Sequence, residues 1–126
     1  MKARLLFAAL ALAAASTVSG ADAGAESIGQ RLAQNSCAQC HSFTKGDGHG
    51  VGPNLFGLLG RPAGSTPGFE FSKAYLDAMK GTPWDRALLD RWLTDTQAVA
   101  PGNGMVYFQD DPKKRAALID YLQTLK

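Results

Sequence analysis

Two cysteines and a histidine stand together in the first half of this 126-residue chain, in the order Cys37-Ala38-Gln39-Cys40-His41. Two thiols on one helical turn can add across the two vinyl groups at one edge of a haem, and the next residue can turn its imidazole to the iron. This spacing is the attachment signature of c-type haem. We therefore predict one haem c, held covalently by Cys37 and Cys40, with His41 as an iron ligand.

Two other interpretations of a C-x-x-C pair are a thioredoxin-like dithiol and half of a zinc site. A thioredoxin-like dithiol needs a βαβ context, which the sequence does not show. A zinc site would need a fourth ligand besides Cys37, Cys40 and His41. The chain has only two cysteines, too few for the framework of a disulfide-rich mini-protein.

An iron held by His41 needs a second axial ligand or an open position, and the chain offers His49, Met79 and Met105. Met105 ends a tight loop, Pro101–Gly104, where irregular backbone can turn a side chain inward. A thioether suits haem iron and favours its reduced state. Met79 falls on a predicted helix, so we expect it in the core. We expect His49 to be a hydrogen-bonding strut, and Met105 to be the second ligand.

The elements that must position these residues are helices. Apolar side chains recur with helical spacing in four stretches: 26–35, 72–80, 82–93 and 111–125. Thr82 and Asp111 are expected to cap the last two, with Pro83 and Pro112 at the first helical position, where a missing N–H costs nothing. No run alternates as a strand would, so the fold class is predicted to be all-α.

A long irregular segment, residues 42–69, contains eight glycines and three prolines. A segment of this length without periodic structure is unusual in a compact domain unless it wraps something. Its apolar residues need a partner, and a large planar cofactor would provide one: they are Phe43, Val51, Leu55, Phe56, Leu58, Leu59 and Phe69.

The N-terminus has the layout of a secretory signal peptide: basic residues, an apolar stretch from Leu5 to Ala15, then small residues. Such a stretch is shorter than the roughly 20 residues of a membrane-spanning helix. We predict a removed leader, residues 1–23 with an end uncertain to 25, and a domain at 24–126. The protein is then exported to the periplasm, with no stable membrane insertion after the leader is removed.

Composition adds one exclusion. With 45% hydrophobic and 19% charged residues, the chain is composed like a globular protein. Its formal net charge is only +2, and the basic residues are scattered rather than clustered. Nucleic acid is therefore not an expected partner.

From Gly29 to Leu122 the sequence resembles class I c-type cytochromes, the mitochondrial type and its soluble bacterial relatives. The motifs that carry the resemblance are Cys37–His41, Gly52–Gly57 with Gly60-Arg61, Gly68-Phe69, Trp84, Pro101–Met105 and Leu118–Leu122. The resemblance implies the cytochrome c fold: about four helices and long loops around one covalently attached haem. It also implies that His41 and Met105 are axial ligands, and that the first and last helices cross where Gly29 allows close approach to Tyr121.

The resemblance assigns roles to three further residues. Pro53 is expected to offer its carbonyl to Nδ1 of His41, a contact that orients an iron-bound imidazole and raises its basicity. Arg61 and the indole N–H of Trp84 match positions that hold the haem propionates, which would otherwise be buried carboxylates without partners.

Some positions depart from the family pattern. Phe71 stands where a tyrosine usually reaches a propionate, so one donor is missing. Trp92 replaces a tyrosine that commonly bonds the methionine sulfur, which leaves an indole N–H as the available donor. Gly50 and Gly104 replace lysines near the haem edge, so the basic ring that steers docking is thinned. Tyr107 replaces a phenylalanine at that edge.

We predict a monomeric, non-enzymatic one-electron carrier that shuttles between redox protein partners of a respiratory or photosynthetic chain. Two strong protein ligands leave no open site for a substrate, which suits a carrier. Two alternatives stay open at this point. One is a haem enzyme or gas-binding protein in which Met105 is displaced. The other is a dedicated electron-accepting subunit of a periplasmic oxidoreductase.

Overall fold

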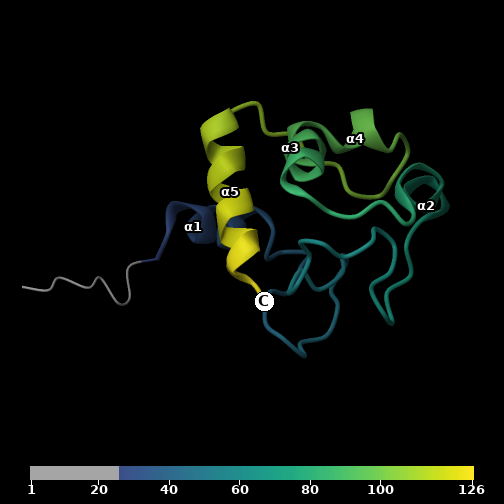
Figure 1. Ribbon diagram of the computed structural model, residues 1–126, viewed down its shortest axis with the longest axis horizontal. Helices are drawn as coiled ribbons and strands as arrows, with labels where there is room; N and C mark the ends of the chain where they lie inside the picture. Colours follow the sequence, from purple (N-terminus) through teal and green to yellow (C-terminus); the bar gives the residue numbers. More distant parts are fainter. Residues whose placement is uncertain (1–25) are drawn as a thin grey trace, which may run out of the picture.

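The computed structural model describes residues 26–126, and within them it contains helices and loops but no strand. The predicted leader, residues 1–23, lies outside the described residues. The predicted all-α fold is confirmed, with one helix more than the sequence indicated (Figure 1). The helices are α1 (Ile28–Ser36), α2 (Lys73–Met79), α3 (Arg86–Thr94), α4 (Thr96–Val99) and α5 (Pro112–Thr124).

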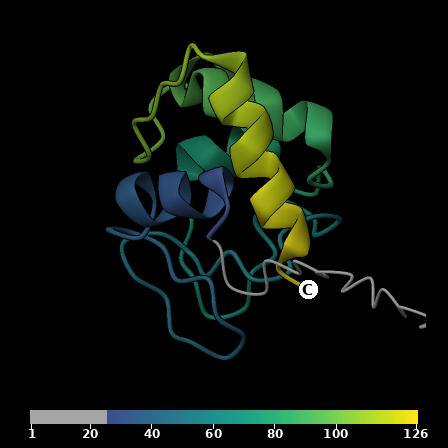
Figure 2. The same cartoon turned by 90° about the vertical axis from the view of Figure 1, so that its left-hand side faces the viewer.

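Helices α1 and α5 cross each other, although they come from opposite ends of the domain (Figures 1 and 2). Gly29 lies at the crossing. A Cβ atom on Gly29 would lie 1.9 Å from the carbonyl oxygen of Ala117 and 2.9 Å from Cβ of Tyr121. The two backbones can approach this closely only because residue 29 has no side chain, as the resemblance implied.

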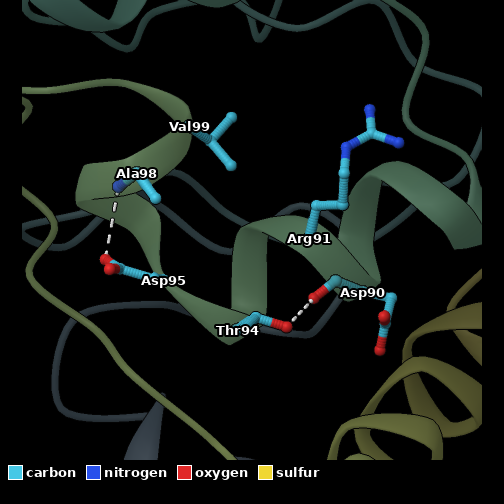
Figure 3. A pocket seen from close by; sticks show the side chains of 6 residues that line it. All are labelled: Asp90, Arg91, Thr94, Asp95, Ala98 and Val99. Atoms are coloured by element: carbon cyan, nitrogen blue, oxygen red, sulfur yellow. Dashed lines mark hydrogen bonds between the residues drawn. The ribbon is translucent and has the colours of Figure 1, made fainter.

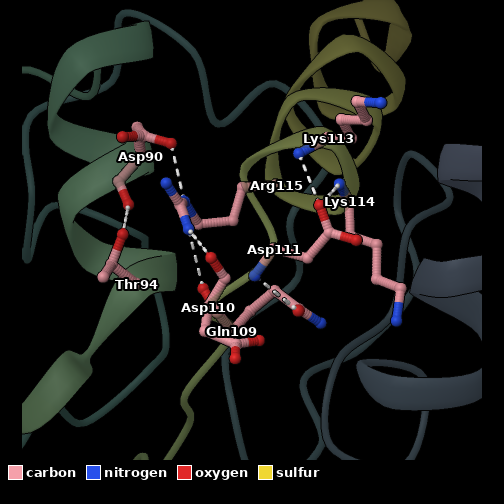
Figure 4. A network of polar contacts seen from close by, with 8 residues as sticks. All are labelled: Asp90, Thr94, Gln109, Asp110, Asp111, Lys113, Lys114 and Arg115. Atoms are coloured by element: carbon pink, nitrogen blue, oxygen red, sulfur yellow. Dashed lines mark hydrogen bonds and ion pairs between the residues drawn. The ribbon is translucent and has the colours of Figure 1, made fainter.

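Helix α5 begins where the sequence predicted. The carboxylate of Asp111 accepts a hydrogen bond from the backbone N–H of Lys113 at 2.8 Å, and Pro112 occupies the first turn. Arg115, one turn further, ties three segments together (Figure 4). Its Nε donates to Asp90 on α3 at 2.8 Å, and its guanidinium also donates to the carbonyl oxygens of Gln109 and Asp110.

Helix α3 begins later than predicted. Its N-cap is Asp85, whose carboxylate accepts from the N–H of Leu88 at 2.7 Å, and not Thr82. Residues 82–84 are instead bonded to another loop: Thr82 accepts from the N–H of Ala63 at 2.8 Å, and the N–H of Trp84 donates to Arg61 at 3.0 Å. The prediction was wrong because these long-range bonds outweigh a local capping signal.

The core is formed mainly by the apolar faces of α3 and α5. Met79 on α2 is 3% exposed and belongs to this core, as predicted. The long irregular segment has no helix and packs beneath the helices (Figure 1). Within residues 26–126, no helix has the length and apolar character needed to span a membrane. The core residues on α3 and α5 are Leu88, Leu89, Trp92, Leu93, Leu118, Ile119 and Leu122.

The α1–α5 crossing gives a first prediction. Replacing Gly29 with alanine should lower the free energy of unfolding by about 1 to 3 kcal/mol, because a methyl group would overlap the backbone of α5. Denaturant unfolding of the variant and of the unaltered protein measures the effect. The control is Gln34→Ala on the exposed face of α1, which should change stability by less than about 0.5 kcal/mol. Equal stability of the two variants would contradict the close packing.

Candidate functional site

One cavity of about 560 Å³ lies between the helices and the long loop, a size common for small-molecule and cofactor sites. Its walls are largely apolar, with Leu58, Leu89, Leu93, Leu118 and Leu122 among the lining residues. Every site residue predicted from the sequence also lines it: Cys37, Cys40, His41, Pro53, Arg61, Trp84, Trp92 and Met105. Segments far apart in sequence therefore converge on one apolar hollow.

Cys37 and Cys40 lie on a turn that continues helix α1. The N–H of Cys37 bonds to Ala33 at 2.8 Å, and the N–H groups of Cys40 and His41 both bond to the carbonyl of Cys37. Burial, with a smaller contribution from the neighbouring Cys40, raises the pKa of the Cys37 thiol to about 11. A thioredoxin-like dithiol needs the opposite shift, because its attacking form is the thiolate. The half-buried Cys37 thiol, with its raised pKa, is therefore poorly suited to dithiol exchange.

A zinc site finds no support either. Among residues 26–126, no group of three or more His, Cys, Asp or Glu side chains is placed to hold a metal ion. Cys37 is half-buried at the cavity wall, and Cys40 is exposed beside it. This placement suits two thioether links at one edge of a haem.

The imidazole of His41 is fixed in one tautomer. Its Nδ1 lies 2.7 Å from the carbonyl oxygen of Pro53, and a carbonyl can only accept, so Nδ1 carries the proton. Burial lowers the pKa of His41, and the bond to Pro53 opposes this shift. The lowered pKa favours the neutral ring, in which the lone pair on Nε2 is available to a metal. The ring also lies against Gly52, where a Cβ atom would come within 2.3 Å of Cε1.

Met105 lies at the cavity wall, on the loop between α4 and α5. The loop is turned by Asn103, which is 5% exposed. The Oδ1 atom of Asn103 accepts from the N–H of Met105 at 2.8 Å. Its Nδ2 donates to the carbonyl oxygens of Thr96 and Ala100, at 3.1 and 2.7 Å. The backbone at Met105 is thus held by a buried side chain rather than by a helix.

Aromatic rings form one side of the cavity. Phe69, Phe71, Tyr75, Trp92 and Trp84 contact one another in that order, with ring centroids 4.8 to 5.7 Å apart. Trp84 and Trp92 are 5% and 6% exposed, and their rings meet edge to face. Such contacts stiffen the wall against which a planar group would pack.

The cavity also has a polar corner at Arg61. The guanidinium donates to Oγ1 of Thr66 at 2.8 Å and to the carbonyl oxygens of Asn54 and Phe56. Arg61 is in none of the ion pairs found among residues 26–126. A half-buried cation without a carboxylate partner among the described residues fits a cofactor that brings its own carboxylates.

Tyr75, which was not among the site residues expected from the sequence, reaches the same corner. It is 9% exposed, and its ring stacks on Phe71 at 4.9 Å. Burial raises the pKa of its hydroxyl, opposed by hydrogen bonds with the Trp84 side chain and the Gly64 backbone. Tyr75 therefore places a hydroxyl beside Phe71, where the family pattern had indicated a missing donor. The sequence feature that could have indicated this role is the hydroxyl of Tyr75, which stands among apolar residues in the predicted helix 72–80.

His49 has the bridging role expected of it. Its Nε2 donates to the carbonyl of Pro67 at 2.9 Å, and its Nδ1 accepts from the N–H of Asn54 at 3.0 Å. His49 does not line the cavity. It connects two parts of the long loop, one of which contains Pro53.

A second hollow, of about 440 Å³, opens on the surface beside α3 and α4 (Figure 3). Several of its polar groups already have partners: the hydroxyl of Thr94 donates to the carbonyl of Asp90, the carboxylate of Asp90 accepts from Arg115, and Asp95 caps α4. It contains none of the predicted site residues. It is lined by Asp90, Arg91, Thr94, Asp95, Ala98 and Val99.

Comparison with known proteins agrees with this geometry. The cytochrome c family model matches residues 27–126. A cytochrome c of Chlamydomonas reinhardtii is 41% identical over 109 residues, covering 86% of this chain and 96% of that protein. Cytochrome c2 iso-2 of Magnetospirillum molischianum is 43% identical over 91 residues, covering 71% and 91%. The solved structure of cytochrome cH from Methylobacterium extorquens has 38% identity and a TM-score of 0.69, covering 80% of this chain and 99% of its own.

The chain belongs to the cytochrome c family. It therefore carries one haem c, attached through Cys37 and Cys40, and it is an electron-transfer protein rather than an enzyme. The residues present fit that group: two thiols at the cavity edge, a neutral imidazole with a free Nε2, apolar walls and a cationic corner.

The contact between His41 and Gly52 gives a second prediction. Gly52→Ala should lower the free energy of unfolding of the haem-loaded protein by about 1 to 3 kcal/mol, because the new methyl group would overlap the imidazole. The matched control is Gly48→Ala in the same loop, where a Cβ atom would meet nothing within 4 Å. Denaturant unfolding of both variants is the measurement. An unchanged stability of Gly52→Ala would show that the ring has room to move.

Proposed function

We propose that this protein is an exported one-electron carrier whose haem iron is six-coordinate, with His41 and Met105 as its axial ligands. The observation that carries the proposal is that an imidazole with a free Nε2 and a thioether reach the same apolar cavity from two distant segments. When bound, the haem supplies the one-electron oxidation and reduction. The side chains that line the cavity determine the polarity around the haem and hold it in place.

Each proposed ligand has a supporting group. Pro53 engages Nδ1 of His41, which raises the basicity of the imidazole and keeps its orientation. The thioether of Met105 favours the reduced state and so raises the potential relative to a second imidazole. The indole N–H of Trp92, in the same cavity, is the proposed donor toward the Met105 sulfur.

The polar corner is proposed to hold the haem carboxylates. Arg61 and Trp84 are the donors, and Tyr75 supplies the hydroxyl that Phe71 lacks. The apolar walls and the aromatic contacts keep water away from the rest of the group. Charge is therefore compensated at one corner, while the remaining surroundings have a low dielectric constant.

The rim of the cavity has exposed apolar side chains together with one exposed carboxylate, Glu70. Val51 and Val106 both line the cavity and are 81% and 83% exposed. The neighbouring residues Gly50 and Gly104 carry no charge. We propose that redox protein partners dock here mainly through short-range contact, because long-range steering requires charges around the rim. The same rim also fits an electron-accepting subunit that stays docked to an oxidoreductase, and co-purification from the native source distinguishes the two.

The proposed second ligand is tested by replacing Met105. Met105→Ala should abolish the weak near-infrared sulfur-to-iron band of the ferric protein, lower the potential and allow added ligands to bind the iron. The control is Met79→Ala, because Met79 is buried in the core away from the cavity. That variant should lose about 2 to 5 kcal/mol of stability and keep the band. If the unaltered protein lacks the band, and the haem spectrum changes in His49→Ala but not in Met105→Ala, the iron has two histidine ligands.

Export is tested by the N-terminus of the mature protein. The segment from Leu5 to Ala15 predicts a removed leader, so N-terminal sequencing of the exported protein should give a start between Gly24 and Glu26. The sequence is to be determined on protein recovered from the periplasm. An intact Met1 chain in the membrane fraction would contradict removal of the leader.

A further inference from the structure

The loop that carries Met105 is attached to one hydroxyl group. Oγ1 of Thr96 donates to the carbonyl oxygen of Met105 at 2.5 Å and accepts from the N–H of Tyr107 at 3.1 Å. One oxygen atom therefore fixes the backbone on the C-terminal side of Met105. The N–H on its N-terminal side is fixed by Asn103 at 2.8 Å.

The backbone N–H and carbonyl of Thr96 also form hydrogen bonds with the Met105 loop. Its N–H donates to the carbonyl of Tyr107 at 3.1 Å, and its carbonyl accepts from Nδ2 of Asn103 at 3.1 Å and from the N–H of Ala100 at 3.0 Å. The residue is 0% exposed. A fully buried hydroxyl is costly unless both its donor and its acceptor roles are used, and here both are used on residues that flank the Met105 side chain.

Gln97, the next residue of α4, supports the loop from its exposed side. Its Nε2 donates to the carbonyl oxygens of Asn103 and Met105, at 3.0 and 3.3 Å, and its Oε1 accepts from the N–H of Gly102 at 3.0 Å. Helix α4 has only four residues. The side chains of Thr96 and Gln97 form their hydrogen bonds with the backbone of the Met105 loop rather than with the backbone of α4.

We propose that Thr96 is a positioning residue that holds the thioether of Met105 in place for the iron, an inference that rests on Met105 being the second ligand. A side chain can compete with water or an added ligand only if its backbone does not swing away. The carbonyl of Met105 and the N–H of Tyr107 are both bound to one buried oxygen, so the loop cannot open without leaving polar groups unpaired. Such a loss corresponds to a factor of about ten in an equilibrium constant.

The test replaces Thr96 with valine, which keeps the shape and removes the hydroxyl. Ferric haem-loaded protein is titrated with imidazole, and amide hydrogen exchange is followed at Met105 and Tyr107. Thr96→Val should bind imidazole about tenfold more tightly than the unaltered protein and exchange both amides faster. Thr96→Ser restores the hydroxyl and should bring imidazole affinity to within about threefold of the unaltered value.

The matched control is Thr94→Val, two residues earlier. The hydroxyl of Thr94 donates to the carbonyl of Asp90 on its own helix and not to the Met105 loop. This variant should lose some stability and leave imidazole affinity unchanged. If Thr96→Val and Thr94→Val lose similar stability and neither changes imidazole affinity, Thr96 has only a structural role and the proposal is overturned.

Two further variants keep the result interpretable. If Thr96→Val does not yield haem-loaded protein, Gln97→Leu removes the weaker attachment of the same loop and should tighten imidazole binding about threefold; no change would count against the proposal. Met105→Ala separates this inference from the proposed function. If that variant keeps the near-infrared band, Met105 is not the ligand, whereas faster amide exchange in Thr96→Val would still show the attachment of the loop.

Discussion

The hydrogen bond between Nδ1 of His41 and the carbonyl of Pro53 is the interaction on which the rest of the site depends. It joins the turn at the end of α1 to a glycine-rich loop that has no helix or strand of its own. Because a carbonyl only accepts, the bond also decides which nitrogen of the ring faces the cavity with a lone pair. His49 holds the loop immediately after Pro53, through the N–H of Asn54. The packing of a loop thus leaves Nε2 with a lone pair that can bind a metal.

A buried asparagine side chain hydrogen-bonds the loop backbone behind each of the two proposed ligands. Asn54 and Asn103 are 8% and 5% exposed, and each accepts from the N–H two residues later while its amide donates to two carbonyl oxygens. Asn54 follows Pro53, and Asn103 precedes Met105 by two positions. Loops buried around a cofactor cannot leave their backbone groups unpaired, and buried amides replace the bonds that a helix would have made. With Thr96, these are the buried polar side chains of the described chain.

Much of this arrangement was predictable from the sequence, for reasons that also explain the failures. The helices with a long apolar stripe were predicted from the helical spacing of their apolar residues. The residue set of the cavity was predicted from C-x-x-C-H and the family motifs. The start of α3 was not, since residues 82–84 are held by a loop about 20 positions earlier in the chain. Helix α4 is too short to show a period. The role of Thr96 depends on tertiary contacts and has no local signal. Tyr75 differs from the apolar residues of its helix only by its hydroxyl, and tertiary contacts decide where that hydroxyl lies.

Polar groups behind the proposed ligands are buried and hydrogen-bonded, whereas Val51 and Val106 expose apolar side chains at the cavity rim. Behind the proposed ligands, hydrogen bonds between buried amides, one hydroxyl and backbone carbonyls leave few ways for the loops to rearrange when the charge on the iron changes. At the rim, Val51 and Val106 are exposed and uncharged, so a partner can approach the cavity edge without displacing tightly bound water. A rigid interior limits the structural change that accompanies electron transfer, and apolar side chains at the rim shorten the path to the partner. Both follow from pairing the buried polar groups behind the proposed ligands while Val51 and Val106 face solvent at the cavity edge.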